Sequence, residues 1–191
     1  MSTLFARPTV DCHREPDGSL LLRSRVPAGR PTPTVLHWLR RHAITTPDVA
    51  LLTVAADGGR RSWTYAEAWA DVRRVAAGFW ACGLGVGDRV VVLGANSVDH
   101  LTATLATMLA GGVAVPLAPQ YAGPAAEHDK LAGLLAILDP AMVWVDTTAR
   151  ADVVVAASSG TAQILVGATG LGALRGDIDP RPEDLDPAAP S

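Results

Sequence analysis

Three short runs contain the glycine and hydroxyl residues typical of loops that bind phosphate. They are residues 83–88 (GLGVGD), 158–161 (SSGT) and 167–172 (GATGLG). A phosphate loop follows a strand, opens a helix and carries a lysine that meets the phosphates. The first run follows a predicted helix and opens a strand, the second leads straight into a strand, and no lysine follows the third. We therefore expect a turn at each of the first two runs and a loop at the third.

Histidines and carboxylates offer no better catalytic set. The histidines are His13, His37, His42, His100 and His128. None is spaced from a cysteine or another histidine as metal ligands are, since His37 and His42 fall out of register on a helix, so surface or capping roles are expected. Asp99, Glu127 and Asp129 lie near predicted helix starts, where the helix dipole alone favours them. We predict no metal site, no cofactor-binding residue and no catalytic residue in this chain.

Composition restricts the class of protein further. Of the 191 residues, 49% are apolar and 18% are charged, which is a globular balance, and the formal net charge is −3. Without a basic excess, a dedicated nucleic-acid binder is not expected. Cys12 and Cys82 are the only cysteines, so we expect two reduced thiols and no disulfide framework.

Targeting signals are not evident in the sequence. The first residues show no charged region leading into an apolar run, so no signal peptide is predicted. The longest apolar stretch, residues 101–117, is interrupted by threonine, glycine and proline, which argues against a membrane span. We therefore expect a soluble, cytoplasmic protein with no membrane partner.

Hydrophobic periodicity predicts an α/β fold. Helical spacing begins at Val35 and ends before Pro47, and two extended runs around residues 57–59 predict a hairpin. The run Thr64-Tyr65-Ala66-Glu67 predicts a capping box and a helix that ends at Gly83. Beyond it, short buried strands are predicted at residues 89–93, 113–116, 142–145 and 163–166, with helices beginning at Ser97 and over 127–138 and 149–157. Such alternation is typical of a mostly parallel sheet with helices on its faces.

The chain divides into three predicted parts. Residues 1–34 form a lead-in arm with a short strand over 19–24, residues 35–176 form the α/β subdomain, and residues 177–191 form a Pro/Asp/Ala-rich linker. Five tryptophans, Trp38, Trp63, Trp69, Trp80 and Trp144, are expected mostly in the core.

Ligands of parallel sheets usually bind beyond the carboxyl ends of the strands. In this sequence those ends are residues 94–97, 117–121 and 146–148. Asn96 and Tyr121 lie there, and we predict that they could line a substrate channel.

The order of several motifs resembles the opening of the adenylate-forming (AMP-binding) superfamily, which includes acyl-CoA synthetases, luciferases and peptide-synthetase adenylation domains. The motifs are Thr46-Pro47-Asp48, Trp63-Thr64-Tyr65-Ala66-Glu67, Gly85-Val86-Gly87-Asp88-Arg89-Val90, Asn96-Ser97, and Leu109-Ala110-Gly111-Gly112-Val113-Ala114-Val115-Pro116-Leu117. The resemblance covers residues 35–145. A finer resemblance, to feruloyl-CoA synthases and related aryl acid–CoA ligases, rests on Arg14-Glu15-Pro16-Asp17-Gly18-Ser19, Leu21-Leu22-Arg23-Ser24, Ala118-Pro119-Gln120-Tyr121 and Glu127-His128-Asp129-Lys130-Leu131.

The resemblance implies the N-terminal portion of the large domain of an acid–CoA ligase. Such an enzyme converts a carboxylate and ATP, with Mg²⁺, into an acyl-adenylate, and then transfers the acyl group to CoA. The superfamily's Pro-Lys-Gly phosphate loop, acidic ribose-binding block and C-terminal catalytic lysine are not within these residues, and Lys130 is the only lysine. We therefore expect no activity and no tight binding of ATP, Mg²⁺ or CoA by this chain alone. Its expected partners are the remainder of the ligase and a small carboxylic acid.

Three alternatives remain open at this stage. The chain could be a standalone, non-catalytic binding or interaction module that reuses the fold. It could also belong to an adenylation domain of another branch of the superfamily. A third possibility is an unrelated doubly wound domain, which a specific, Mg²⁺-dependent nucleotide affinity would indicate.

Overall fold

A computed structural model describes residues 9–26, 33–56, 59–123, 128–158, 160 and 162–174. The chain divides into two compact units, Met1–Thr32 and Pro33–Ser191, and each is described by itself. The predicted linker at 177–191 lies outside the described residues, as does Glu127, the predicted first residue of a helix.

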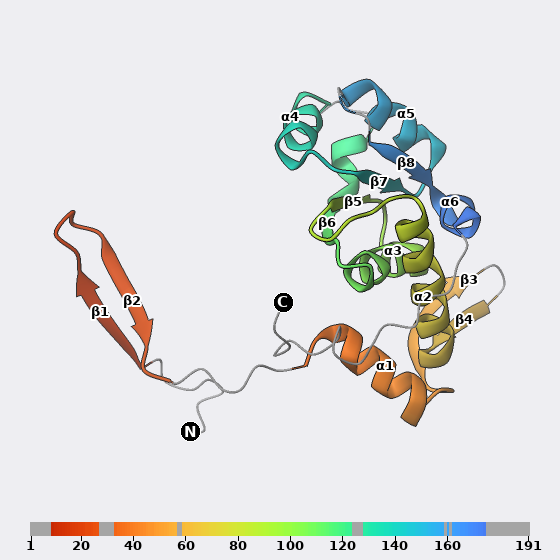
Figure 1. The fold of residues 1–191 in the computed structure, drawn as a ribbon, viewed down its shortest axis with the longest axis horizontal. Coiled ribbons are helices and arrows are strands. Elements are labelled where there is room, and N and C mark those ends of the chain that lie inside the picture. Colours follow the sequence, from red (N-terminus) through yellow and green to blue (C-terminus); the bar gives the residue numbers. More distant parts are fainter. Residues whose placement is uncertain are drawn as a thin grey trace. The chain divides into compact units, whose positions relative to one another are not determined.

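The first unit contains one antiparallel hairpin, β1 (Val10–Arg14) and β2 (Leu20–Ser24) (Figure 1). Its turn contains Gly18 at a φ of +86°, and the Asp17 carboxylate accepts the amide of Ser19 at 2.9 Å. This confirms the turn and the second strand that the sequence predicts. The first strand was not predicted, because its sequence VDCHR has no apolar run and alternates apolar and polar residues over only four positions.

The second unit begins with α1 (Val35–Thr45) and a hairpin of β3 (Ala50–Ala56) and β4 (Gly59–Thr64). The longest helix, α2 (Tyr65–Ala81), follows at once and begins with the predicted capping box. The Thr64 hydroxyl accepts the Glu67 amide at 3.2 Å, and the Glu67 carboxylate accepts the Thr64 amide at 2.8 Å. The helix ends at a turn in which Gly83 and Gly87 have φ values of +89° and +82°, so the turn predicted for residues 83–88 is confirmed.

Four parallel strands form the central sheet, in the order β6-β5-β7-β8. They are β5 (Arg89–Leu93), β6 (Val113–Leu117), β7 (Met142–Val145) and β8 (Gln163–Val166). Every pair of neighbours is parallel, as the alternation of strands and helices predicts. Figure 1 shows the sheet between the labelled helices of this unit.

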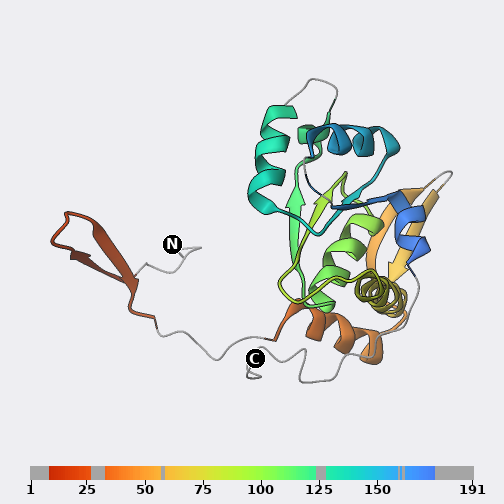
Figure 2. The ribbon, with the colours of Figure 1, turned by 45° about the horizontal axis from the view of Figure 1, so that its top comes forward.

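Helices cover both faces of the sheet (Figure 2). They are α3 (Val98–Leu109), the short 3₁₀ helix η1 (Pro119–Ala122), α4 (His128–Leu138), α5 (Thr148–Ala157) and α6 (Gly167–Ala173). Side chains alternate along a strand, so Val90 and Val92 join one apolar cluster with α1, α2, α3 and α6. Val91 and Leu93 join the other cluster, with η1, α4 and α5. The α/β fold expected from the sequence is therefore confirmed.

Strand β6 departs from the prediction, because it is an edge strand and not a buried one. Val113 and Pro116 are exposed, whereas β7 is buried along its whole length. Val113 donates its amide to the carbonyl of Asp88 at 2.8 Å, and alternate residues of a strand point to opposite edges. The nitrogen of Pro116 therefore points to the outer edge, where the missing N–H costs no ladder hydrogen bond. An apolar sequence alone does not distinguish an edge strand from a central one.

Residues 167–172 also depart from the prediction, because they form α6 and not a loop. Glycine-rich sequence disfavours a helix, so the helix depends on packing. Leu171 and Leu174 are buried in the larger apolar cluster. At Gly78 in α2, an added Cβ would lie 2.2 Å from the Cβ of Leu174, which shows how closely the end of α6 approaches α2.

The tryptophans divide into two groups. Trp63 and Trp144 are buried, and Trp69 packs against the core. Trp38 and Trp80 are 41% and 49% exposed, so the core expectation is wrong for these two. Trp80 lies near the end of α2 and donates its indole N–H to the carbonyl of Ala110 at 2.7 Å. Its polar edge is thereby satisfied while part of the ring remains in solvent.

Two further observations concern thiols and membranes. Cys12 and Cys82 are free and exposed. Within the described ranges, no helix combines the length and hydropathy that crossing a bilayer requires.

The capping box predicts a pH dependence of stability. The hydrogen bonds from the Thr64 amide and hydroxyl hold the pKa of Glu67 below its ordinary value of 4.5. Stability from this carboxylate is therefore present above pH 4.5 and is lost as the pH falls through the lowered pKa. We expect Glu67→Gln to flatten the acid limb of a urea-denaturation series. An acid limb identical to that of the unsubstituted chain would contradict the assignment.

A pair of glycine substitutions tests the contact between α2 and the end of α6. Gly78→Ala should destabilise the protein by about 1–3 kcal/mol, because the new methyl group collides with Leu174. Gly133→Ala is the matched control: Gly133 is in α4, and an added Cβ would meet nothing within 4 Å. It should stabilise the protein by roughly 1 kcal/mol through helix propensity. Urea midpoints measure both changes, and a stabilising Gly78→Ala would refute the close approach.

Candidate functional site

The carboxyl ends of β5, β6 and β7 lie at the same edge of the parallel sheet, as the alternation of strands and helices predicts. Asn96 is exposed in the turn between β5 and α3. Tyr121 lies in η1, after β6, and packs half-buried against the apolar cluster on the α4 and α5 side. The two predicted residues therefore follow neighbouring strands but have different surroundings.

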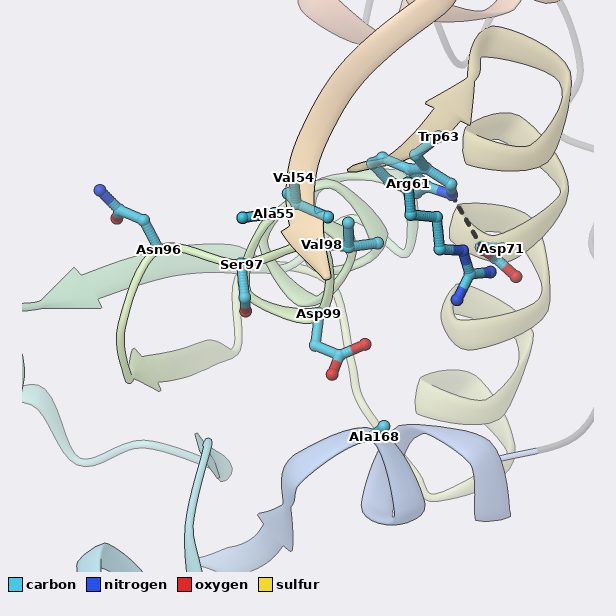
Figure 3. Close-up of a pocket in the computed structure, with 10 residues that line it drawn as sticks. All are labelled: Val54, Ala55, Arg61, Trp63, Asp71, Asn96, Ser97, Val98, Asp99 and Ala168. Carbon is cyan, nitrogen blue, oxygen red and sulfur yellow. Dashed lines mark hydrogen bonds between the residues drawn. The ribbon is translucent and has the colours of Figure 1, made fainter. Parts of the chain in front are cut away.

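Asn96 contributes to a cavity of about 540 Å³. Its described lining comes from the β3–β4 hairpin, α2, the start of α3 and α6 (Figure 3). The lining residues are Val54, Ala55, Arg61, Trp63, Asp71, Asn96, Ser97, Val98, Asp99 and Ala168. Figure 3 shows Asn96 on the opposite side of this cavity from Arg61 and Asp71. Tyr121 is not among the residues that line it.

The local sequence explains how the start of α3 reaches the cavity. The Ser97 hydroxyl accepts the amide of His100 at 3.1 Å, so Ser97 is the N-cap and its neighbours Asn96 and Val98 are fixed on either side. A second, more apolar cavity of about 290 Å³ adjoins these residues. It shares Val54, Asn96 and Ser97 with the first cavity and adds Leu52, His100 and Leu101.

Charges are concentrated at one end of the larger cavity. Asp71 accepts the indole N–H of Trp63 at 3.1 Å and pairs with Arg74 at 3.4 Å. Burial, together with the like charge of Asp71, raises the pKa of Asp99 above its ordinary value. Arg61 supplies a guanidinium to the same lining (Figure 3). This end of the cavity therefore presents two carboxylates and one cation.

A separate polar network joins the ends of β5 and β7. The Asp146 carboxylate follows β7, accepts the amide of Ala95 at 2.8 Å and pairs with Arg150 of α5. Burial acts to raise the pKa of Asp146, but these two partners hold it below the ordinary value. At Gly94, an added Cβ would lie 2.9 Å from the Trp144 ring and 3.0 Å from the Asp146 side chain. The two strand ends are therefore in direct contact.

His100 packs against this network from α3. Its ring makes an edge-on contact with Trp144, with centroids 6.0 Å apart, and Trp144 donates its indole N–H to the carbonyl of Gly167 at 3.2 Å. Burial lowers the pKa of His100, although the charge of Asp146 opposes the shift. A partly buried imidazole that contacts an aromatic ring is typical of packing.

The described lining of the cavity has the features of a binding surface and not those of a reaction centre. It includes no lysine, histidine or cysteine, and no serine is hydrogen-bonded to a base there. In the part of the chain that the structure describes, no three histidine, cysteine, aspartate or glutamate side chains are placed to hold a metal ion. The geometry can orient a ligand by charge and shape, but it lacks an activated nucleophile.

Two features of this edge were not singled out from the sequence. The pairing of Asp71 with Trp63 joins a helix to a hairpin, and sequence spacing gives no sign of it. Asp146 carries a weak signal, because a carboxylate directly after a buried strand falls at the ligand-binding edge. Its partner Ala95 is 51 residues away, so only the structure shows the contact.

Sequence comparisons agree with this architecture. A sequence model of the family described as AMP-binding enzyme matches residues 39–162. The chain is 34% identical over 135 residues to 4-coumarate–CoA ligase 2 of Oryza sativa subsp. japonica, covering 69% of this chain and 23% of that protein. It is 37% identical over 75 residues to a mitochondrial medium-chain acyl-CoA ligase of Danio rerio, covering 39% of this chain and 12% of that protein.

A solved structure supports the same fold. A putative long-chain-fatty-acid CoA ligase from Rhodopseudomonas palustris superposes with a TM-score of 0.64 at 24% identity, over 78% of this chain and 37% of that one. The present chain thus spans less than a quarter of either curated relative and little more than a third of this structure. Because the family match covers more than half of its 191 residues, the chain belongs to the AMP-binding enzyme family.

Proposed function

We propose that this chain is the N-terminal part of an ATP-dependent acid–CoA ligase and is inactive by itself. The complete enzyme would join a carboxylate to AMP with release of pyrophosphate, and would then transfer the acyl group to CoA. The family match over residues 39–162 is the observation that carries this proposal. The proposed partners are the remainder of the ligase and a small carboxylic acid, and the proposed location is the cytoplasm.

The proposed acid is an aryl acid such as a hydroxycinnamate. The similarity to a 4-coumarate–CoA ligase supports this choice, as do the lead-in motifs that resemble feruloyl-CoA synthases. The similarity to a medium-chain acyl-CoA ligase covers a shorter part of the chain. A fatty acid is therefore the competing substrate class to include in a test.

The residues that line the described cavity support the proposal that the isolated chain is inactive. Enzymes of this family use ATP, Mg²⁺ and CoA, and a triphosphate needs a cradle of amides and cations. The described cavity instead combines two carboxylates with one guanidinium, and the only lysine of the chain, Lys130, lies in α4. These residues do not supply the positive charge that a nucleoside triphosphate needs. We propose that they support a site completed by other parts of the ligase.

Within that site, Asn96 and Tyr121 are proposed to line the substrate channel. Asn96 is exposed and borders both cavities at the edge of the sheet. Tyr121 follows the neighbouring strand and is half-buried. Of the two residues, Asn96 has the surroundings that better suit contact with a small molecule.

The activity prediction is tested with the purified 191-residue chain. With ATP, Mg²⁺ and a hydroxycinnamate, we expect no acid-dependent release of pyrophosphate above a mock preparation from cells with an empty vector. A 4-coumarate–CoA ligase assayed in parallel is the positive control. Robust, acid-dependent release by the 191-residue chain would overturn the proposed inactivity.

The acid–CoA ligase assignment is tested separately by sequencing the reading frame that follows codon 191. An in-frame, glycine-rich run ending in Pro-Lys-Gly soon after codon 191 would support it. The protein expressed from the complete reading frame should release pyrophosphate faster with 4-coumarate than with a medium-chain fatty acid. The reverse preference would refute the aryl acid proposal while leaving the ligase assignment in place.

A further inference from the structure

The turn between β5 and α3 carries Asn96, so whatever fixes this turn also fixes one wall of both cavities. The residue directly before Asn96, Ala95, is exposed, and its amide donates to the Asp146 carboxylate at 2.8 Å. Ser97, directly after Asn96, is held by its own capping bond to His100. The turn is therefore held at two points, one on α3 and one at the end of β7.

The Asp146 carboxylate is itself held in place. Arg150 lies one helical turn further along the chain and pairs with it, and both side chains are mostly buried, at 24% and 18% exposure. The backbone of Arg150 is fixed in turn, because its amide donates to the Thr147 hydroxyl at 3.3 Å. The Arg150 Nε is buried and has no hydrogen-bond partner among the described residues. Asp146 is thus the ion partner that compensates the burial of this guanidinium.

The space around the turn leaves Asp146 little freedom. A Cβ at Gly94 would lie 2.9 Å from the Trp144 ring and 3.0 Å from both Cβ and Cγ of Asp146. The glycine therefore lets the backbone directly after β5 approach the carboxylate closely. Among the described residues, the guanidinium of Arg150 from α5 and the titratable imidazole of His100 from α3 face Asp146.

We propose that Asp146 is a positioning residue that sets the conformation of the Asn96 turn from the neighbouring strand. Its relevance to substrate binding rests on the proposed ligase function. Its effect on the turn can be measured without any ligase activity. A charged acceptor makes a stronger hydrogen bond to an amide than a neutral one, so the carboxylate is the part of the side chain that matters.

The test compares Asp146→Asn with Asp152→Asn, a matched change at an exposed position of α5, the helix that follows Asp146. NMR hydrogen exchange should show the protection of the Ala95 amide falling about tenfold to a hundredfold in Asp146→Asn. The Asn96 and Ser97 amide resonances should shift as well, and Asp152→Asn should change none of these signals. Unaltered Ala95 protection and unaltered Asn96 resonances in folded Asp146→Asn would overturn the proposal.

A pH titration of the unsubstituted chain provides a second measurement, which decides the question if Asp146→Asn does not fold. The Ala95 amide resonance should titrate with a midpoint below 3.8, because the partners of Asp146 lower its pKa. An Ala95 resonance that does not titrate would refute the contact. These outcomes are independent of the pyrophosphate assay, so failure of the ligase assignment and failure of this inference can be told apart.

Discussion

The central strands β5 and β7 are buried on both faces, apart from exposed Arg89, so their amides and carbonyls must be satisfied by neighbouring strands. The order β6-β5-β7-β8 meets this requirement by placing β5 and β7 inside the sheet, and the parallel pairing keeps the carboxyl ends of all four strands at the same edge. The two apolar clusters follow from it, because alternate residues of each strand supply one cluster or the other. The edge that carries Asn96 is thus set by parallel pairing of strands in a buried sheet.

At that edge, polar groups are joined across strands and not along the chain. Asp146 reaches the turn after β5, and Trp63 of the hairpin reaches Asp71 of α2. The contact between Trp63 and Asp71 is partly buried, where an unsatisfied group would be costly. The cavity bordered by Asn96 is therefore built on fixed neighbours, and its described lining includes no activated nucleophile. This combination is consistent with a supporting subdomain of a larger AMP-binding enzyme.

Local signals in the sequence were sufficient for most of the fold. The capping box at Thr64 and Glu67 and the strands at residues 89–93, 142–145 and 163–166 agree with the structure, because each depends on neighbours in the chain. The errors arose where tertiary contacts decide whether a segment forms a helix or where a strand lies in the sheet. Helix α6 forms despite its glycines because Leu171 is buried. Strand β6 has the sequence of a buried strand but lies at an edge, and Asp146 binds an amide 51 residues away.

Because of Pro116, the two edges of the sheet differ in the backbone hydrogen-bond donors that they present. On β6, the residues that point outward are Ala114 and Pro116, and the proline offers a carbonyl but no donor. On β8, Gln163 donates inward to Ala141 at 3.0 Å, so Ile164 turns both its amide and its carbonyl to the outside. The outer edge of β8 therefore presents the amide of Ile164, whereas the outer edge of β6 lacks a donor at Pro116. A single proline thus makes the two edges of the sheet different in the hydrogen-bond donors that they offer to a further strand.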